Sequence, residues 1–449
     1  MIELAERALA AARGDEAEAF VHSERSGLAR FAASQIHQPT LIENVLVRLR
    51  IVRDGRVGWA STNRIGDESL AALARRAGEA ADSAPRDPDF PGLVAGTELP
   101  AVDGFDDETA ALGADDQARL ARAAIDAVGD FELYGFVTTG VTELAVASTA
   151  GVRAEQRLTD ATALVLAAQD GASGYAEATS WAAPAIDPAA VAREAAAKGA
   201  RTRGAADLEP GSYGAVLEPY ALAELIDYFA FDSFNGLALV EGRSAVAGKL
   251  GERLFDEKIS ISDDALDPRG LPKAFDFEGT PKQRVPLVEA GVARGAVWDR
   301  ITAARAGEQP TGHAPPQELR TYGPIPFALS VAPGAAASAE ELADLVGDGI
   351  YVTRFHYLSV VNPREGVITG MTRDGTFRIR DGKIADPLVN LRFTVSVPAM
   401  LQDVPGLTRE TTLVNRSEFY GERYPFGVLC PALATARFTI TGSGSGPGL

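Results

Sequence analysis

Two aspartates, Asp227 and Asp232, are the first candidates for chemistry, because they occur in a helix-like stretch with aromatic residues between them. Residues 221–236 read ALAELIDYFAFDSFNG, with apolar residues at helical spacing and an Asn-Gly pair at the end. Five residues along an α-helix turn through about 140°, so this spacing does not favour a shared carboxylate pair. The stretch is therefore either a catalytic helix or a core helix with acids on its solvent side.

The histidines and the cysteine offer no local catalytic motif. No two of the four histidines, His22, His37, His313 and His356, lie within helical reach of each other, so an HExxH-type zinc pair is absent. His313 and His356 could shuttle protons, but a loop histidine and a strand histidine with local hydrogen bonds are the favoured interpretation. Cys430 lies in the apolar run GVLCPALATARFTI, which indicates a buried strand residue and a poor nucleophile.

A run of acids further along the chain could bind a hard cation. Ser262, Asp263 and Asp264 are followed closely by Asp267, and carboxylates are the ligands that such a cation prefers. A proline and a glycine come directly after them, however, and acids beside these residues are more typical of a solvated turn. We therefore expect a solvated turn here.

Three other motifs could suggest a functional site, but a structural or chance explanation is simpler for each of them. Ser173 lies between glycines in a predicted hairpin turn, so we expect a turn residue rather than a nucleophile. The glycine-rich residues 441–449 follow a strand-like run and open no helix, which predicts a flexible tail rather than a phosphate loop. Asn415, Arg416 and Ser417 match the glycosylation sequon, which is a chance match in a protein that is not secreted.

These residues must be positioned by an α+β fold. Residues 1–205 predict an N-terminal domain built from two duplicated α/β units, residues 1–83 and 105–205, joined by a Pro-, Gly- and Asp-rich linker, residues 84–104. Residues 206–449 contain many short β-type runs between Gly and Pro, which predicts a mainly β C-terminal domain.

The duplication rests on a repeated hairpin pattern. In the first unit, strand-like runs at residues 18–22 and 43–62 are followed by a helical pattern, and the second unit repeats this order. Both units contain the pattern DGxxG-aromatic-Ala: Asp54, Gly55, Gly58, Trp59 and Ala60 in the first, and Asp170, Gly171, Gly174, Tyr175 and Ala176 in the second. Asp-Gly between alternating runs predicts a two-residue hairpin turn in each unit.

Charge and composition exclude several classes of protein. The net charge is −19 and no basic cluster breaks the acidic background, so binding to nucleic acid or to an anionic membrane is disfavoured. No run of about 18 apolar residues predicts a membrane span. The N-terminal stretch predicts an amphipathic helix containing acids rather than a signal peptide, and a single cysteine suits a reducing compartment. We therefore expect a cytoplasmic location.

Several motifs of residues 210–440, in order and spacing, resemble the TldD/PmbA family, also called the modulator of DNA gyrase family, and in particular its TldE/PmbA branch. The first is SAVAGKLGE, which matches a family SxxxGKxGE pattern, and it is followed by the SDD run and by FEGTPKQ. The matching positions are Ser244, Gly248, Lys249, Gly251, Glu252, Asp263, Asp264, Glu278, Gly279 and Gln283. The resemblance implies that these positions are structural.

The resemblance also assigns a meaning to the opening helix. The peptidase branch, TldD, resembles a zinc protease with HExxxH just upstream of SxxxGKxGE and a cysteine ligand further downstream. Counted back from Ser244, the HExxxH positions are held here by Asp227, Tyr228 and Asp232. The region that resembles the neighbourhood of the cysteine, residues 406–408, contains none. The resemblance therefore implies a chain without catalytic or metal-binding residues of its own.

What the resemblance implies is a partner role. The chain would pair with a TldD-like zinc peptidase, as a heterodimer or a larger assembly, and zinc would be held by the partner. The complex would degrade or trim unfolded or extended peptides, leader peptides among them, and this subunit would help to hold the substrate as an added β-strand. Two alternatives stay open: a stand-alone homodimeric peptide-binding or chaperone-like protein, and an independent hydrolase that uses carboxylates near Asp227 and Asp232.

Overall fold

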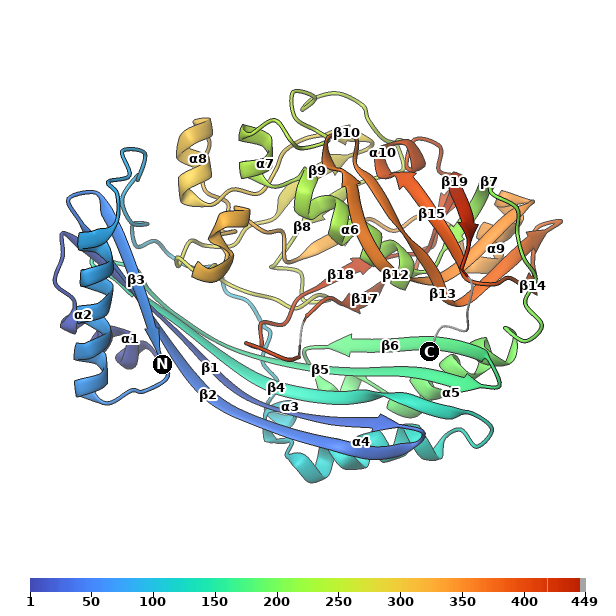
Figure 1. Cartoon of the computed structure of the whole chain (residues 1–449), viewed down its shortest axis with the longest axis horizontal. Helices are drawn as coiled ribbons and strands as arrows, with labels where there is room; N and C mark the ends of the chain where they lie inside the picture. The colour runs from blue at the N-terminus through green and yellow to red at the C-terminus, as the bar shows by residue number, and fades with distance from the viewer. Residues whose placement is uncertain (418, 445–449) are drawn as a thin grey trace.

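The computed structural model describes residues 1–417 and 419–444. Figure 1 shows a long curved sheet below a second, mainly β part that contains helix α6. The long sheet is antiparallel throughout and has the strand order β3-β2-β1-β4-β5-β6. Its strands are β1 (Glu16–Ala32), β2 (Gln35–Arg53), β3 (Arg56–Thr62), β4 (Glu132–Ser148), β5 (Arg153–Gln169) and β6 (Ala172–Ser180).

Both predicted hairpins are confirmed. Asp54 and Gly55 have φ values of 48° and 68°, and Asp170 and Gly171 have 49° and 79°, which are the left-handed conformations that a two-residue hairpin turn requires. The first strands are much longer than the predicted run at residues 18–22. Polar residues interrupt the apolar pattern of β1, and two of them, His22 and Glu24, are buried and bond to Arg423 of the C-terminal part.

The second glycine of the repeated DGxxG pattern has the same packing role in both units. A Cβ atom at Gly58 would lie 2.0 Å from the backbone nitrogen of Ala81 in α2 (Asp67–Ser83). A Cβ atom at Gly174 would lie 2.1 Å from the carbonyl oxygen of Ala195 in α5 (Pro188–Ala200). Each glycine therefore lets a helix approach its hairpin closely, which explains the second glycine of the DGxxG pattern.

Helices cover one face of the long sheet (Figure 1). Besides α2 and α5 they are α1 (Ile2–Ala11), α3 (Asp107–Ala111), α4 (Ala114–Asp126) and the 3₁₀ turn η1 (Ala183–Ala185). α1 and α2 pack on one end of the sheet and α4 and α5 on the other, as two separate apolar clusters. Residues 84–104 contain no helix or strand, yet Leu93 and Val94 are buried, so the predicted linker is packed against the molecule.

The C-terminal part contains two further sheets. One has the order β12-β7-β19-β15-β13-β14, with β16 paired to β19, and the other has the order β10-β9-β8-β11-β18-β17. The first is formed by β7 (Gly211–Leu217), β12 (Gly349–Asn362), β13 (Val367–Arg380), β14 (Lys383–Pro387), β15 (Leu391–Ser396), β16 (Gly406–Leu407) and β19 (Leu433–Ser443). The second is formed by β8 (Ile261–Asp263), β9 (Val285–Glu289), β10 (Val292–Ala293), β11 (Leu329–Val331), β17 (Thr412–Asn415) and β18 (Gly427–Cys430).

Helix α6 (Pro219–Ser233) lies in the largest apolar cluster, between these sheets. It begins with a proline in its first turn and is followed by α7 (Gly236–Val240), whose first amides are capped by the side chain of Asn235. The predicted helix at residues 221–236 thus corresponds to α6, and the Asn-Gly pair that was expected to end it is where α7 begins. The remaining helices are α8 (Arg300–Ala306), η2 (Gln317–Tyr322), α9 (Ala339–Val346), η3 (Pro363–Glu365) and α10 (Val397–Met400).

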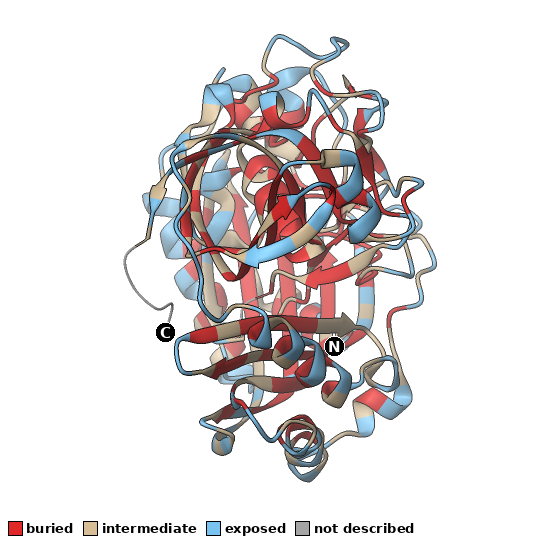
Figure 2. Ribbon diagram, turned by 90° about the vertical axis from the view of Figure 1, so that its right-hand side faces the viewer, coloured by how far each residue is buried: buried red, intermediate tan, exposed pale blue. Residues whose placement is uncertain are grey.

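The α+β prediction is confirmed, with a largely β C-terminal region, while the exact domain boundaries stay a prediction. Figure 2 shows buried residues along the strands of both parts and exposed residues on the outer helices and loops. The expected tail begins too early, because β19 extends to Ser443; residues 445–449 lie outside the described residues. None of the helices in the described residues has the length and apolar character needed to span a membrane.

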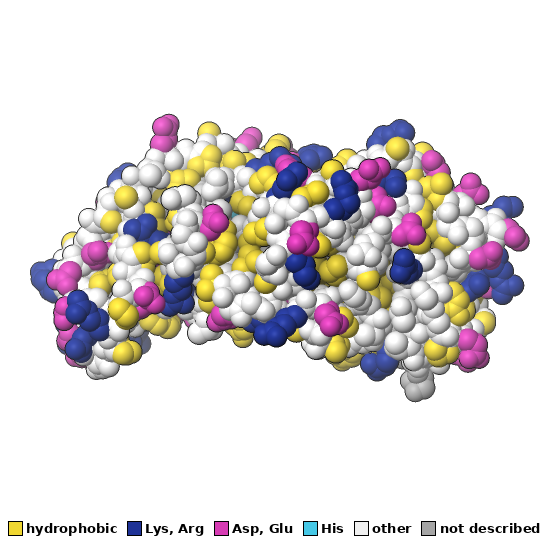
Figure 3. All heavy atoms as spheres, turned by 90° about the horizontal axis from the view of Figure 1, so that it is seen from above, with side chains coloured by type: hydrophobic (Ala, Val, Ile, Leu, Met, Phe, Trp, Pro, Cys, Tyr) yellow, Lys and Arg dark blue, Asp and Glu magenta, His cyan; other side chains and the backbone are white. Residues whose placement is uncertain are grey.

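The face of the molecule seen from above carries charges of both signs in a dispersed form. In Figure 3, Asp and Glu side chains are interspersed with Lys and Arg side chains over the face that is seen from above. This face has no continuous patch of one sign.

Candidate functional site

A cavity of about 780 Å³ lies between the long sheet and α6. β1 and β2 form one wall, α6 another, and residues 316–327, Arg416 and residues 422–426 close the sides. Its lining residues are His22, Arg48, Asp227, Tyr228, Phe231, Asp232, Phe277, Pro316, Glu318, Leu319, Ile325, Phe327, Val360, Arg416, Glu422, Tyr424 and Phe426. All three residues that sequence comparison placed at the HExxxH positions therefore line this cavity.

Asp227 is held by an arginine from a distant segment. The Nε atom of Arg416 donates to Oδ2 of Asp227 at 2.9 Å, and both side chains are about one-fifth exposed. Burial raises the pKa of Asp227, and the charge and hydrogen bond of Arg416 oppose this shift. The carboxylate is thus engaged by a cation of the chain itself.

Asp232 faces a different arginine. Its Oδ1 atom lies 3.6 Å from Nη1 of Arg243, too far for a hydrogen bond, and its side chain accepts no hydrogen bond in the described part of the chain. Burial raises the pKa of Asp232, and Arg243 opposes this shift. Because each aspartate has its own arginine, the two do not form a shared acid pair.

The donor set at this place does not suit zinc. Neutral imidazole and thiolate are the usual ligands, with a glutamate as general base, and α6 offers no imidazole. The Arg416 guanidinium on Asp227 would repel a second cation. Burial raises the pKa of Tyr228 above its ordinary value, so its phenol cannot act as a base near neutral pH. Among the described residues, no group of three or more His, Cys, Asp and Glu side chains could hold a metal ion.

The SxxxGKxGE segment supports the end of α6 from outside the cavity. The Ser244 hydroxyl donates to the carbonyl oxygen of Ser233, the last residue of α6, at 2.6 Å. Gly248 and Gly251 have φ values of 72° and 91°, so the segment makes two left-handed turns. Lys249 donates to the backbone of Ala245, and Glu252 bonds back to Lys249 through its amide. None of these five motif residues lines the cavity.

The expectation of a solvated turn at residues 262–264 is wrong for Asp263. This residue ends strand β8 and is completely buried, and its carboxylate accepts hydrogen bonds from His313 Nε2 and from the amide of Ala328, both at 2.8 Å. The covering histidine lies fifty residues further along the chain, so local sequence could not reveal it. Asp264 does make a turn, with its carboxylate 3.4 Å from Nε of Arg284.

The FEGTPKQ motif contains a buried ion cluster. Glu278 lies 3.0 Å from Nη1 of Arg50 and 2.8 Å from Nη1 of Arg320. Burial alone would raise the pKa of Glu278, but Arg320 and Arg50 outweigh it and lower the pKa to about 2. Gly279 has a φ of 77°, and Gln283 donates a weak hydrogen bond to Pro310 at the surface. These positions are structural rather than part of the cavity.

The other sequence candidates lie away from the cavity or are inert. Cys430 is fully buried and burial raises its pKa, as the apolar sequence around it predicts. Ser173 lies in strand β6, directly after the hairpin turn rather than in it as expected, and its hydroxyl donates to Asp374. His356 is a strand residue in β12, as expected, and its ring contacts that of Tyr357 at an angle of 46°.

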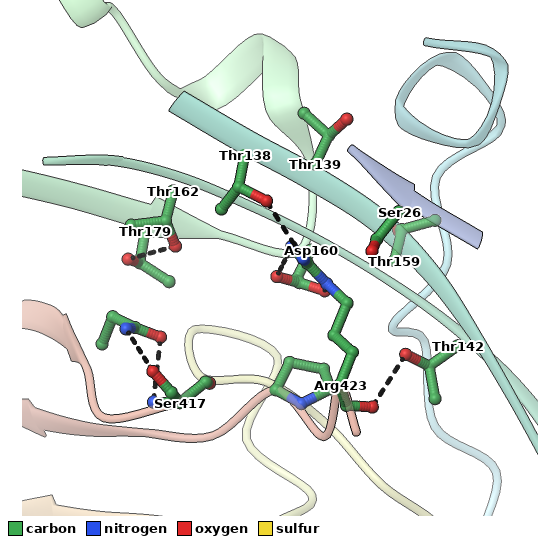
Figure 4. Close-up of polar contacts among 12 residues, drawn as sticks. Ser26, Thr138, Thr139, Thr142, Thr159, Asp160, Thr162, Thr179, Ser417 and Arg423 are labelled. Carbon is green, nitrogen blue, oxygen red and sulfur yellow. Dashed lines mark hydrogen bonds and ion pairs between the residues drawn. The ribbon is translucent and has the colours of Figure 1, made fainter. Parts of the chain in front are cut away.

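A second arginine from the 416–426 segment anchors this segment to the long sheet (Figure 4). Arg423 donates to both carboxylate oxygens of Asp160, at 2.8 and 2.6 Å, and to the hydroxyl of Thr138 at 3.0 Å. Its carbonyl oxygen accepts from His22 Nε2 at 2.8 Å. A Cβ atom at Gly140 would lie 2.3 Å from Nε of Arg423, so only glycine leaves room for this arginine.

Sequence reasoning missed the residues that complete the site. Arg416 was seen only as the middle of a sequon, and it meets Asp227 across 189 residues of chain. Glu318 and Glu422 both bind Arg48, Glu318 through Nε at 2.9 Å and Glu422 through Nη2 at 2.5 Å, and none of the three belongs to a motif. No local pattern could have identified these residues, because their partners come from different strands and loops.

Comparison with known proteins agrees with this architecture. Residues 210–442 match the model of the PmbA/TldA metallopeptidase C-terminal domain, and residues 17–81 match that of PmbA/TldA metallopeptidase domain 1. A metalloprotease of Methanothermobacter thermautotrophicus is 28% identical over 205 residues, 44% of this chain and 43% of that protein. A zinc metalloprotease TldD homolog of Saccharolobus solfataricus is 24% identical over 206 residues, 44% of each chain. The chain thus spans less than half of the length of these relatives.

Solved structures share the whole fold. TldE of Thermococcus kodakarensis has a TM-score of 0.85 at 20% identity, over 98% of this chain and 99% of that one. A proposed modulator of a DNA gyrase from Thermotoga maritima has a TM-score of 0.84 at 18% identity, with the same coverage. The C-terminal match alone covers more than half of the residues. The chain belongs to the PmbA/TldD family.

Proposed function

We propose that this chain is the non-catalytic, metal-free subunit of a TldD/TldE-type heteromeric zinc metallopeptidase, and that it acts in the cytoplasm. The observation that carries the proposal is the Asp227–Arg416 ion pair in the cavity wall, at a helix position where a zinc peptidase of this family would need a ligand. Unlike a zinc ion, an arginine in that place has no coordination site for water. It can bind a substrate oxygen through its positive charge, but it cannot activate water.

The subunit's task in this proposal is to hold an extended peptide. The cavity is large enough for several residues of extended chain, and its walls combine aromatic rings with charged groups that have unfilled hydrogen-bonding capacity. Similarity in fold to TldE and similarity in sequence to TldD homologues support a place in such an assembly. Peptide degradation and leader-peptide trimming are the activities that we propose for the complex.

The structure gives less support to an independent hydrolase. Such an enzyme would need a carboxylate free to act as a base together with a second acid, and Asp227 and Asp232 are directed to separate arginines. A stand-alone peptide-binding homodimer would use the same cavity, so the partner test below separates it from the leading proposal.

Purification with and without a TldD-type zinc peptidase tests the proposal. We expect the chain alone to contain less than 0.1 equivalent of zinc by mass spectrometry of metals, which is about background, and to cleave no unfolded casein. Mixing the two chains should give a complex by size exclusion, and casein cleavage should exceed that of the partner alone. Stoichiometric zinc or cleavage in the isolated chain would refute the proposal, and absence of any complex would favour the homodimer.

A further inference from the structure

Two charged side chains of opposite sign in the cavity have unused hydrogen-bonding capacity. Arg416 uses only its Nε atom on Asp227, and its two Nη groups make no hydrogen bond in the described part of the chain. Asp232 accepts no hydrogen bond there either, and its side chain is 21% exposed. A donor and an acceptor are therefore available to a ligand in the same cavity.

The distance between them along α6 suits an extended peptide. Asp227, which holds Arg416, and Asp232 are five residues apart, a rise of about 7.5 Å along the helix axis. Two residues of extended chain span about 6.6 Å. Because the two aspartates also point about 140° apart around the axis while both line the cavity, a peptide lying along α6 would meet them with groups two or more residues apart.

The electrostatics of the cavity favour a cation at Asp232. The residue lies in the last turn of α6, where the negative end of the helix dipole disfavours an acid and favours a positive group. The lining contains four carboxylates, those of Asp227, Asp232, Glu318 and Glu422, against two guanidinium groups, and the Arg243 guanidinium, 3.6 Å from Asp232, offsets only part of this excess. An acidic ligand would meet a net negative wall, and a ligand with a cationic nitrogen would meet an attractive one.

A row of aromatic rings supplies the apolar part of the wall. Phe277 and Tyr424 have ring centroids 4.7 Å apart, Tyr424 and Phe327 are 5.3 Å apart, and Phe327 and Phe426 are 5.0 Å apart. All four rings line the cavity. Apolar side chains of a bound peptide would pack on this row.

We propose that Arg416 and Asp232 form a subsite that orients an extended peptide, with Arg416 donating to a main-chain carbonyl oxygen and Asp232 accepting from a cationic nitrogen two or more residues away. The cation is an N-terminal ammonium group or the side chain of a lysine or arginine. The inference rests on the proposed function, which supplies a peptide as the occupant, and it adds the orientation and the charge preference.

Fluorescence anisotropy with the full chain tests this subsite. The probe is a seven-residue peptide of Leu, Val, Phe and Ser, labelled at its C-terminal end, in three forms: a free N-terminus, an acetylated N-terminus, and an acetylated N-terminus with one lysine near it. We expect acetylation to weaken binding at least tenfold if the N-terminal ammonium is recognised, and the lysine to restore binding if a side chain is recognised. Equal affinity of the wild-type chain for all three forms would overturn the proposal.

Two variants locate the recognition. Asp232→Asn should abolish the difference between the charged and the uncharged probe, whereas Asp126→Asn, which removes one exposed acid from α4, should preserve it. Arg416→Lys keeps a charge beside Asp227 but removes the planar fork, so it should weaken every probe about tenfold. Wild-type affinities in Asp232→Asn and Arg416→Lys would refute the subsite.

The two proposals can fail separately. The binding assay uses the isolated chain and needs no cleavage, whereas the proposed function is tested by zinc content and by activity with the partner. Failure of the isolated chain to bind any form of the probe would overturn the subsite and would leave the result with the partner unaffected. Charge-dependent binding without any stimulated cleavage would support the subsite and refute the partner role.

Discussion

The 416–426 segment brings two arginines to two aspartates, and the two pairs differ in almost every physical respect. Arg423 and Asp160 are each 3% exposed and make two hydrogen bonds with each other, while Arg416 and Asp227 are 22% and 23% exposed and make one. The first pair lies against the long sheet, and the second lies in the cavity wall. Full burial and saturated bonding mark a pair that holds the structure together, and partial exposure with unused donors marks a pair available to a ligand.

Removal of Arg423 should have the largest effect on stability. In Arg423→Met the carboxylate of Asp160 is left buried without a partner, so we expect a loss of about 3–5 kcal/mol in the free energy of unfolding, measured by urea denaturation. The double variant Asp160→Asn with Arg423→Met no longer buries a charge and should recover a large part of this loss. If both variants unfold like the wild type, the pair is not structural.

The buried ion cluster around Glu278 should make the free energy of unfolding depend on pH. The pKa of Glu278 is lowered from an ordinary value of 4.5 to about 2, so the folded state favours the ionised form. Ionised Glu278 therefore adds about 3 kcal/mol to the free energy of unfolding. This stabilisation is fully present above pH 4.5 and is lost as the pH falls through 2. Glu278→Gln should therefore flatten the pH dependence of the free energy of unfolding between pH 4.5 and 2. Parallel curves for variant and wild type would contradict the assignment.

Neutralising the cavity pair should have the smallest effect on folding. Asp227→Asn removes a partly exposed partner, so we expect a change below about 1 kcal/mol in the free energy of unfolding. Binding of the peptide probes should change more than stability does, because Arg416 loses the group that positions it. A loss of stability as large as in Arg423→Met would remove the distinction between the two pairs.

The sequence predicted those features that depend on neighbours along the chain. The Asp-Gly turns, the paired helices and the burial of Cys430 follow from local patterns, and the helix with Asp227 and Asp232 was found by its apolar spacing. The full length of β1 was not predictable, because buried polar residues such as His22 and Glu24 interrupt its apolar pattern and find their partner in the distant Arg423. The burial of Asp263 and the presence of Arg416 in the cavity depend in the same way on segments that are distant in sequence.

Gly140 has a consequence for how sequences of this family can diverge. Because a Cβ atom at this position would occupy the space of the Arg423 side chain, a substitution at residue 140 is tolerated only together with a smaller residue at 423. Loss of the arginine in turn leaves Asp160 unpaired, so a third position must change as well. We therefore expect positions 140, 160 and 423 to vary as a set among related sequences, and a lineage that changes this set to reposition the segment that also carries Arg416.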